Sequence, residues 1–475
     1  MNSSHELTWS SVLCAIAIAI IIVVPDLSPR IFLGDSLSYL AATQINWWPN
    51  DRSMLYPAII KTIWMTFSSL SPLFYLQAAA FGITTGIAAL IINRGLGVRN
   101  AVAIPVILLI AIDPLRLVWP SFIMTETFSI LSTSLSIYFL VGYIAKPRVR
   151  GIIGVALVGF ISYLLRSIDM PIFATALLLT PLAIALIDRH ASVPETVGRP
   201  LSARRALFHT TVGLCLFVSL YAGYVQIYRA TIGQPASLPY QPQLTLLCPM
   251  IPLISVSMFP DQAMGQRILA RADPWFRDIR ARNAECFSPT GLRQLVIAEA
   301  GSMAEAERVA AVVNRRILMT NPAEVVAMAF RTIGDYFDFD YMREVMAVDV
   351  GIGRSDAAEV SRQLKEFFGI SPDNHVYISP TMLYYIGSAS LIWIVVLSPI
   401  VLFLSTMWLA PRSLVGWLMT AIVTYYVFVP GGLLTVRACA RYLQPVSFFF
   451  LVALAFLCET YLQRAASSRA SARTL

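Results

Sequence analysis

The chain has 475 residues, of which 57% are hydrophobic and 13% charged, and its mean hydropathy is +0.69. This composition excludes a soluble protein with a small core and indicates an integral membrane protein. The formal net charge of +8 does not indicate a nucleic-acid partner, because the basic residues cluster at the ends of apolar runs, as topology signals do.

Ten apolar runs approach the roughly 20 residues that a bilayer-spanning helix requires. In chain order, the predicted spans are 9–24, 73–93, 101–118, 121–144, 151–169, 170–188, 207–227, 383–408, 413–431 and 443–463. The third run is interrupted by Pro105. We keep it as a span, because omitting this span would move the basic cluster after the fourth run to the outer side. The predicted fold class is therefore an all-α polytopic membrane protein with about ten transmembrane helices.

These spans divide the chain into four predicted regions. With the N-terminus in the cytoplasm, the short inner segments carry more Lys and Arg than the outer ones, as the positive-inside rule requires. Residues 1–227 then form an N-terminal membrane region with a long first outer loop. Residues 228–382 form a mostly helical extracytoplasmic domain between spans seven and eight. Residues 383–463 form the C-terminal membrane helices, and 464–475 a disordered cytoplasmic tail.

The predicted extracytoplasmic domain has two notable features. Its apolar run 244–259 is interrupted by Pro249 and Pro252, so we expect a buried or interfacial segment there rather than a span. Cys248 and Cys286 both lie in this domain, and the sequence allows either a disulfide between them or two free thiols.

Acidic residues from three different loops fall on the predicted outer side. They are Asp26, Asp35, Asp51, Asp113, Glu126 and Asp169. An ionised side chain near hydrocarbon costs roughly 2.5–3.5 kcal/mol on insertion scales, so charges kept there usually line a cavity or pair with each other. The alternative is that each acid is merely solvated in a wet loop.

Three arginines accompany these acids on the side that the positive-inside rule depletes, namely Arg166, Arg437 and Arg441. Arg437 and Arg441 are four residues apart and would point the same way on a helix. A guanidinium matches phosphate oxygens with two parallel hydrogen bonds, which favours an anionic, lipid-linked ligand. The alternative for Arg166 is a pair with Asp169 across one turn that only fastens a short loop.

The chain resembles the GT-C superfamily of polyprenyl-phosphate-sugar-dependent glycosyltransferases, which includes aminoarabinose transferases and protein O-mannosyltransferases. The resemblance lies in the order of these residues along the chain and in the side of the membrane on which they are predicted to fall. The matching residues are Gly34-Asp35-Ser36 with Tyr39, Tyr56-Pro57, Asp113-Pro114, Thr125-Glu126, Leu165-Arg166, and Arg441-Tyr442 with Pro445. The chain departs from many members in carrying Ser36 where they have a second acid.

The resemblance implies a transfer of sugar from a polyprenyl-phosphate donor to an envelope lipid, glycan or protein, on the extracytoplasmic face of a bacterial inner membrane. Asp35 would be the general base, and inversion at the anomeric carbon would follow. The implied donor-phosphate ligands are Arg166, Arg437 and Arg441. Asp113, Glu126 and Asp169 would orient the acceptor or hold a divalent metal ion. Apart from that ion, no cofactor is implied.

Two alternatives to a glycosyltransferase stay open at the level of sequence. A transporter or flippase for a lipid-linked or anionic substrate would also have polar residues facing a cavity, although transporters concentrate them near the middle of the bilayer. A membrane-embedded assembly subunit without chemistry would need Asp35 only for stability, if at all.

Overall fold

A computed structural model describes residues 9–32, 35–43, 53–190, 201–232, 242–352, 362, 365–368 and 378–474. These residues form helices and no strand, apart from one isolated bridge between Arg30 and Phe122. The predicted all-α class is therefore confirmed for the described part of the chain. Gly34 and Asp51 of the first predicted outer loop lie outside the described residues.

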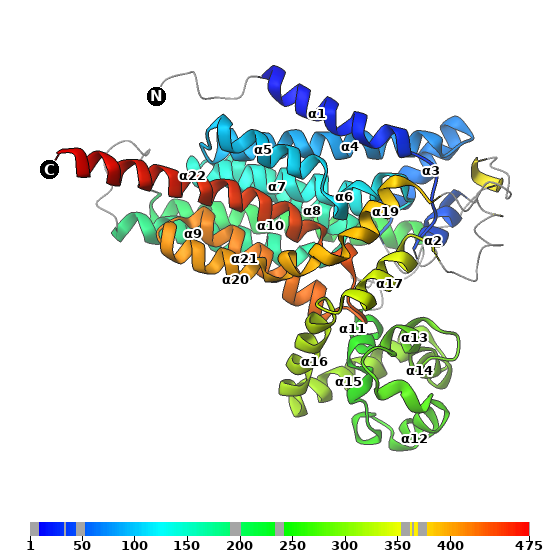
Figure 1. The fold of residues 1–475 in the computed structure, drawn as a ribbon. Helices are drawn as coiled ribbons and strands as arrows, with labels where there is room; N and C mark the ends of the chain where they lie inside the picture. Colours follow the sequence, from blue (N-terminus) through cyan, green and yellow to red (C-terminus); the bar gives the residue numbers. More distant parts are fainter. Residues whose placement is uncertain are drawn as a thin grey trace.

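Most of the long helices run alongside one another as a bundle (Figure 1). They are α1 (Trp9–Val23), α4 (Ser71–Leu90), α5 (Asn100–Ala111), α7 (Glu126–Ala145), α8 (Val149–Leu165), α9 (Met170–His190), α10 (Ala203–Ile232), α20 (Ile392–Leu409), α21 (Leu414–Phe428) and α22 (Gln444–Thr474). By length and composition, eight helical segments of the described chain could cross a membrane, or nine if one bent pair is a single span. The chain is thus a multi-pass membrane protein, and ten spans stays a prediction, because α8 is shorter than the other candidates.

The bent pair is the third predicted span. Helix α5 ends at Ala111, and α6 (Pro114–Leu117) continues at an angle of 44°. Asp113 caps α6, because its side chain accepts a hydrogen bond of 3.0 Å from the backbone nitrogen of Leu115. Pro114 at the first helical position favours this new start.

Helix α1 packs directly on α4 because α4 presents glycines to it. A Cβ atom added at Gly82 would lie 2.6 Å from Cγ1 of Ile20, and one at Gly86 would lie 2.6 Å from Cγ1 of Ile16. Small residues at such contacts let two membrane helices approach closely, so that packing rather than burial from water holds them together.

The first predicted outer loop contains two helices of its own, α2 (Ser36–Leu40) and α3 (Leu55–Phe67). Both lie with α6 and α19 (Pro380–Gly387) at one end of the bundle (Figure 1). We call this end the domain-side end, because the helical domain described next attaches there.

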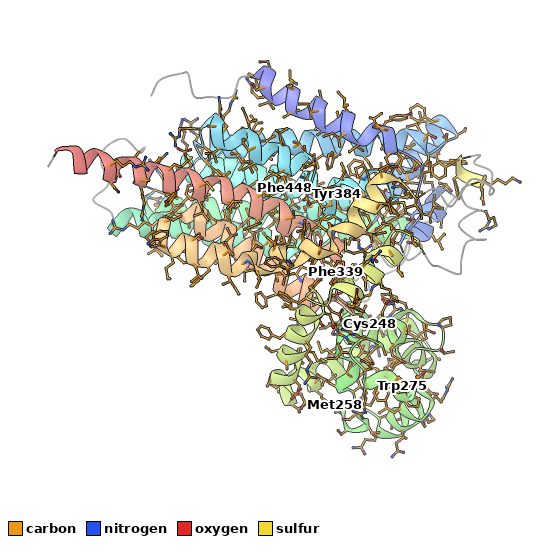
Figure 2. All side chains as sticks on the ribbon, in the orientation of Figure 1. Cys248, Met258, Trp275, Phe339, Tyr384 and Phe448 are labelled. Carbon is orange, nitrogen blue, oxygen red and sulfur yellow. A yellow bond between two sulfur atoms is a disulfide. The ribbon has the colours of Figure 1, made fainter. Side chains whose placement is uncertain are left out.

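The helical domain comprises α11 (Pro242–Met250), α12 (Gln262–Arg271), α13 (Arg282–Phe287), α14 (Leu292–Ala300), α15 (Met303–Thr320), α16 (Pro322–Asp335) and α17 (Phe339–Asp349). It attaches near the domain-side end and projects sideways from the bundle (Figure 1). It has its own hydrophobic core. The apolar run 244–259 is buried in this core, as expected, with Leu244 and Ile251 fully inaccessible. Cys248 and Cys286 form a disulfide, so the free-thiol alternative is wrong (Figure 2).

The prediction of a disordered tail at 464–475 is wrong as far as Thr474, because α22 continues to that residue. The tail is rich in Ala and Arg, which are strong helix formers. It also extends a helix that already exists, so it does not meet the cost of nucleation.

Candidate functional site

Four chain segments that are far apart in sequence meet at the domain-side end of the bundle. Asp35 directly precedes α2, Glu126 is the first residue of α7, and Arg166 follows the last residue of α8. Arg441 lies in the short helix η13 (Ala440–Leu443), just before α22. We call these four residues the Arg441 cluster.

Arg441 bridges two carboxylates. Its Nη1 donates to Oδ2 of Asp35 at 2.7 Å, and its Nε lies 3.4 Å from Oε1 of Glu126. The three side chains differ in exposure, at 12% for Arg441, 3% for Glu126 and 30% for Asp35. Asp35 is therefore the acid of this group that a ligand can reach most directly, and Glu126 lies deeper.

Aromatic rings surround the two arginines of the cluster. The guanidinium carbon of Arg441 lies 4.7 Å from the ring centroid of Phe32 and 5.4 Å from that of Tyr442. Arg166 lies 5.3 Å from the same Tyr442 ring. Tyr442 thus contacts both cations, and such contacts favour a guanidinium by about 0.5–2 kcal/mol, depending on how far it is desolvated.

Ser36 fixes the segment that carries Asp35. Its Oγ accepts a hydrogen bond from the backbone nitrogen of Phe32 and donates one to the carbonyl of Ile123, each at 2.8 Å. The neighbouring backbone adds two more bonds, between Arg30 and residues 121 and 123. Ser36 is fully buried, so its role here is to position Asp35, and a second acid would not fit in its place.

Arg166 keeps hydrogen-bond donors available for a ligand. Burial disfavours its charged form, but Glu126 and Asp169 outweigh that effect, so the pKa of Arg166 is raised. Among the described residues, no hydrogen bond or ion pair engages its guanidinium, which lies against the Tyr442 ring. The alternative role for Arg166, an ion pair with Asp169 that fastens the loop, is not supported, because Asp169 acts on Arg166 only at longer range.

Glu126 also has unused hydrogen-bonding capacity. Its Oε2 is buried and has no hydrogen-bond partner in the described part of the chain, and Nε of Arg441 is in the same state. Leaving a buried polar group unsatisfied costs about 1–3 kcal/mol, and more for a charged one. A ligand hydroxyl or a water bound beside Glu126 would relieve this cost.

Asp169 lies in a separate network of hydroxyl groups. It accepts hydrogen bonds from Ser162 at 2.7 Å, Tyr426 at 2.7 Å and Ser129 at 3.1 Å. These donors come from α8, α21 and α7, and Asp169 is only 1% exposed. The network connects three helices, and it leaves Asp169 poorly placed for the predicted acceptor or metal role.

Asp113 and Arg437 also lie apart from the Arg441 cluster. Besides capping α6, Asp113 accepts a hydrogen bond of 2.8 Å from Ser447 on α22. Arg437 donates to Asp349 of the helical domain at 2.6 Å. Arg437 and Arg441 do not share a helix face, because the backbone from 434 to 439 is not helical.

An apolar cavity begins at Pro171, five residues after Arg166. It has a volume of about 360 Å³ and lies between α9 and α21, lined by residues such as Pro171, Leu179, Ala421 and Tyr425. At one end of it, the Tyr425 hydroxyl donates to the carbonyl of Ile168 at 2.6 Å, two residues after Arg166. Its lining suits an extended hydrocarbon chain.

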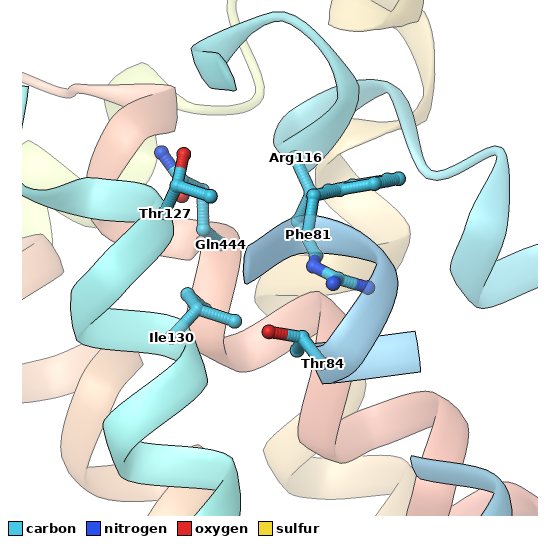
Figure 3. A pocket seen from close by; sticks show the side chains of 6 residues that line it. All are labelled: Phe81, Thr84, Arg116, Thr127, Ile130 and Gln444. Carbon is cyan, nitrogen blue, oxygen red and sulfur yellow. The ribbon is translucent and has the colours of Figure 1, made fainter. Parts of the chain in front are cut away.

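A second cavity, shown in Figure 3, is too small for any substrate. Its volume is about 10 Å³, close to the minimum for one water molecule. In Figure 3 the Arg116 guanidinium lies beside Thr84, whereas Gln444 lies beside Thr127. Nη2 of Arg116 and Nε2 of Gln444 have no hydrogen-bond partner among the described residues.

No group of three or more His, Cys, Asp or Glu side chains in the described part of the chain is placed to hold a metal ion. Glu126 and Asp35 both face Arg441, whose positive charge opposes a cation between them. The divalent metal suggested by the resemblance therefore finds no ligand set there.

Sequence reasoning missed several residues of this region. The polar network around Asp169 includes Ser129 and Tyr426, which look like ordinary members of apolar runs. Two adjacent tyrosines, Tyr425 and Tyr426, inside a predicted span were the available signal. Asp349 lies in a charged helix of the domain, and nothing in the sequence singled it out.

Comparison with known proteins assigns no role to these residues, so their own chemistry is the basis for interpreting them. The chain matches no family model, no curated protein sequence and no solved structure.

Proposed function

We propose that the chain is a membrane glycosyltransferase that moves a sugar from a polyprenyl-phosphate donor to an acceptor hydroxyl at the Arg441 cluster. The observation that carries the proposal is the convergence of Asp35, Glu126, Arg166 and Arg441 from four distant segments. Two acids and two arginines beside an apolar cavity match a ligand that has an anionic head, hydroxyl groups and a hydrocarbon tail.

In the proposed reaction, the donor phosphate approaches Arg441 and Arg166, whose guanidinium groups match phosphate oxygens. The phosphate takes over part of the interaction between Arg441 and Asp35, and this frees the carboxylate. The acceptor oxygen attacks the anomeric carbon while its proton passes to Asp35, a step that typically contributes 10²–10⁴-fold. The bond from the anomeric carbon to the phosphate oxygen breaks, and the leaving polyprenyl phosphate keeps the electron pair.

The two arginines then stabilise the charge that develops on the leaving phosphate. Direct attack from the side opposite the phosphate inverts the anomeric configuration. Glu126, with one buried oxygen unsatisfied, accepts a hydrogen bond from a sugar or acceptor hydroxyl. The apolar cavity between α9 and α21 accommodates part of the polyprenyl chain.

The disulfide supports an extracytoplasmic site. Disulfides persist in oxidising compartments such as the bacterial periplasm and are rare in the cytosol. Cys248 and Cys286 lie in the helical domain, which attaches at the same end of the bundle as the Arg441 cluster. We therefore assign the site to the extracytoplasmic face of an inner membrane, with an envelope lipid, glycan or protein as acceptor.

The direct test is sugar transfer by the purified full-length protein in liposomes that contain a polyprenyl-phosphate sugar. Asp35→Asn keeps the shape and removes the base, so transfer should fall by about 10²–10⁴-fold at equal abundance. Asp340→Asn makes the same change at an exposed carboxyl on α17, serves as a matched control and should retain transfer. Unchanged transfer by Asp35→Asn would remove Asp35 from this role, and movement of the intact donor across the bilayer without transfer would favour a flippase.

A further inference from the structure

Helix α16 and the end of α15 carry a row of apolar side chains that are largely exposed. Val326 and Phe330 are four residues apart on its surface and are 53% and 56% exposed. Leu318 and Met319, at the end of α15 directly before it, are also exposed, Met319 by 70%. We call these four residues the α16 stripe. Exposed apolar groups that gather in this way mark a surface for a partner or a membrane.

The remaining faces of α16 show that the helix is amphipathic. Val325, Met328, Ala329 and Ile333 are buried on one side. Glu324 and Arg331 are exposed on the side away from the stripe. A helix with one buried face, one exposed apolar face and charges on a third side has the pattern of an element that lies in a membrane surface.

The position of α16 identifies what would cover the stripe. Figure 1 shows α16 running across the direction of the bundle helices, at the domain-side end, and extending sideways beyond them. The ring of Phe330 lies 5.7 Å from that of Phe428, the last residue of the candidate spanning helix α21. The stripe therefore begins where a spanning helix ends and continues outward in the plane of the surrounding bilayer surface.

We propose that the α16 stripe rests in the surface of the bilayer leaflet on the domain side, with Met319, Val326 and Phe330 among the lipid headgroups and upper acyl chains. The occupant is the membrane, because the stripe is continuous with the lipid-facing surface of the bundle. This contact would hold the helical domain at a fixed height beside the Arg441 cluster.

The test is photolabelling of the full-length protein in phosphatidylglycerol and phosphatidylcholine liposomes that contain a phospholipid with a photoreactive acyl chain. Peptides that cover residues 318–330 should be labelled, as those of spanning helices are. Peptides from α12, on the domain surface away from the bundle in Figure 1, should not be. This readout detects lipid contact and not sugar transfer, so its outcome is independent of the proposed function.

Matched variants sharpen this test. Val326→Glu should lower labelling of the 318–330 peptide to the level of α12, and Phe330→Glu should act in the same direction. Trp275→Glu removes a 72% exposed aromatic side chain on the other side of the domain in Figure 2 and should change nothing. Equal labelling of α12 and α16 in the unmodified protein would overturn the proposal. So would a dimer in the liposomes whose contact shields the stripe from lipid.

Discussion

At the scale of single residues, the central feature is one arginine that serves two carboxylates. Arg441 is close to Asp35 and Glu126, and it is almost enclosed. With Arg166 nearby, two positive and two negative side chains balance one another. Removing one member of such a set upsets this balance of buried charge, so we expect the buried members to be sensitive to substitution.

Replacing Arg441 tests this balance. Arg441→Gln should lower the free energy of unfolding by about 3–5 kcal/mol, because it removes the guanidinium that contacts both Asp35 and the buried Glu126. It should also abolish measurable sugar transfer. The measurement is denaturant unfolding in detergent together with the transfer assay.

The matched control for this substitution is a more exposed ion pair. Arg308 pairs with Glu305 at 2.7 Å, and the two side chains are 76% and 44% exposed. Arg308→Gln should cost no more than about 1 kcal/mol and leave transfer intact. A similar loss of stability in both variants would show that the Arg441 cluster is no more demanding than a surface pair.

At the scale of helices, close packing depends on small residues at a few positions. Gly82→Ala on α4 would place a Cβ atom 2.6 Å from Ile20 Cγ1 and 2.9 Å from the carbonyl oxygen of Ile16. Because backbone as well as side chain must shift, the cost should be about 1–3 kcal/mol. Gly142→Ala on α7 meets nothing within 4 Å and should be neutral or slightly stabilising. Equal thermal stability of the two variants in detergent would contradict this account of the contact between α1 and α4.

The start of α17 should make the helical domain sensitive to acid. A hydrogen bond from the Tyr341 backbone, and next one from Arg280, lower the pKa of Asp338 below its ordinary value of 3.8. A carboxyl whose pKa is lowered by folding stabilises the fold above its unfolded pKa, and this contribution is lost as the pH falls through the lower, folded value.

Below about pH 4, the amides of α17 should lose protection from hydrogen exchange in the unmodified protein, and Asp338→Asn should reduce this loss. Hydrogen exchange of α17 peptides, corrected for its intrinsic pH dependence, measures this. Identical pH profiles for the variant and the unmodified protein would assign the acid sensitivity to other groups.

The sequence predicted which segments are helical better than it predicted where each helix begins and ends. The apolar runs identified helices throughout the membrane region, because length and hydropathy decide that choice. The break at Asp113 and the helical tail after Gln463 depend on capping and on helix extension, which an apolar-run analysis does not see. Helix α3 was missed because it is shorter than a span and follows a polar loop.

At the scale of the whole molecule, the predicted charge sidedness grouped these acids and arginines on one side, and the tertiary contacts divide them into separate sets. Asp35, Glu126, Arg166 and Arg441 converge, whereas Asp113, Asp169 and Arg437 bind other partners. The sequence could not separate these groups, because each partner comes from a segment distant in the chain. The partner of Arg437, Asp349, belongs to the helical domain.

The disulfide provides a test of orientation for the whole molecule. It joins residues separated by 38 positions in the helical domain and should stabilise that domain by about 2–4 kcal/mol. In membranes isolated without reductant, Cys248 and Cys286 should resist maleimide until they are reduced. Free, reactive thiols at both positions in such membranes would place the domain, and the Arg441 cluster with it, on the reducing side.

The central claim is sugar transfer that depends on Asp35, and envelope mass spectrometry tests it most directly. Cells that lack the chain should lose one sugar-bearing lipid, glycan or protein species and accumulate a polyprenyl-phosphate sugar. The unmodified protein should restore that species, and Asp35→Asn at equal abundance should not. Restoration by Asp35→Asn, or an envelope unchanged by loss of the chain, would contradict the account.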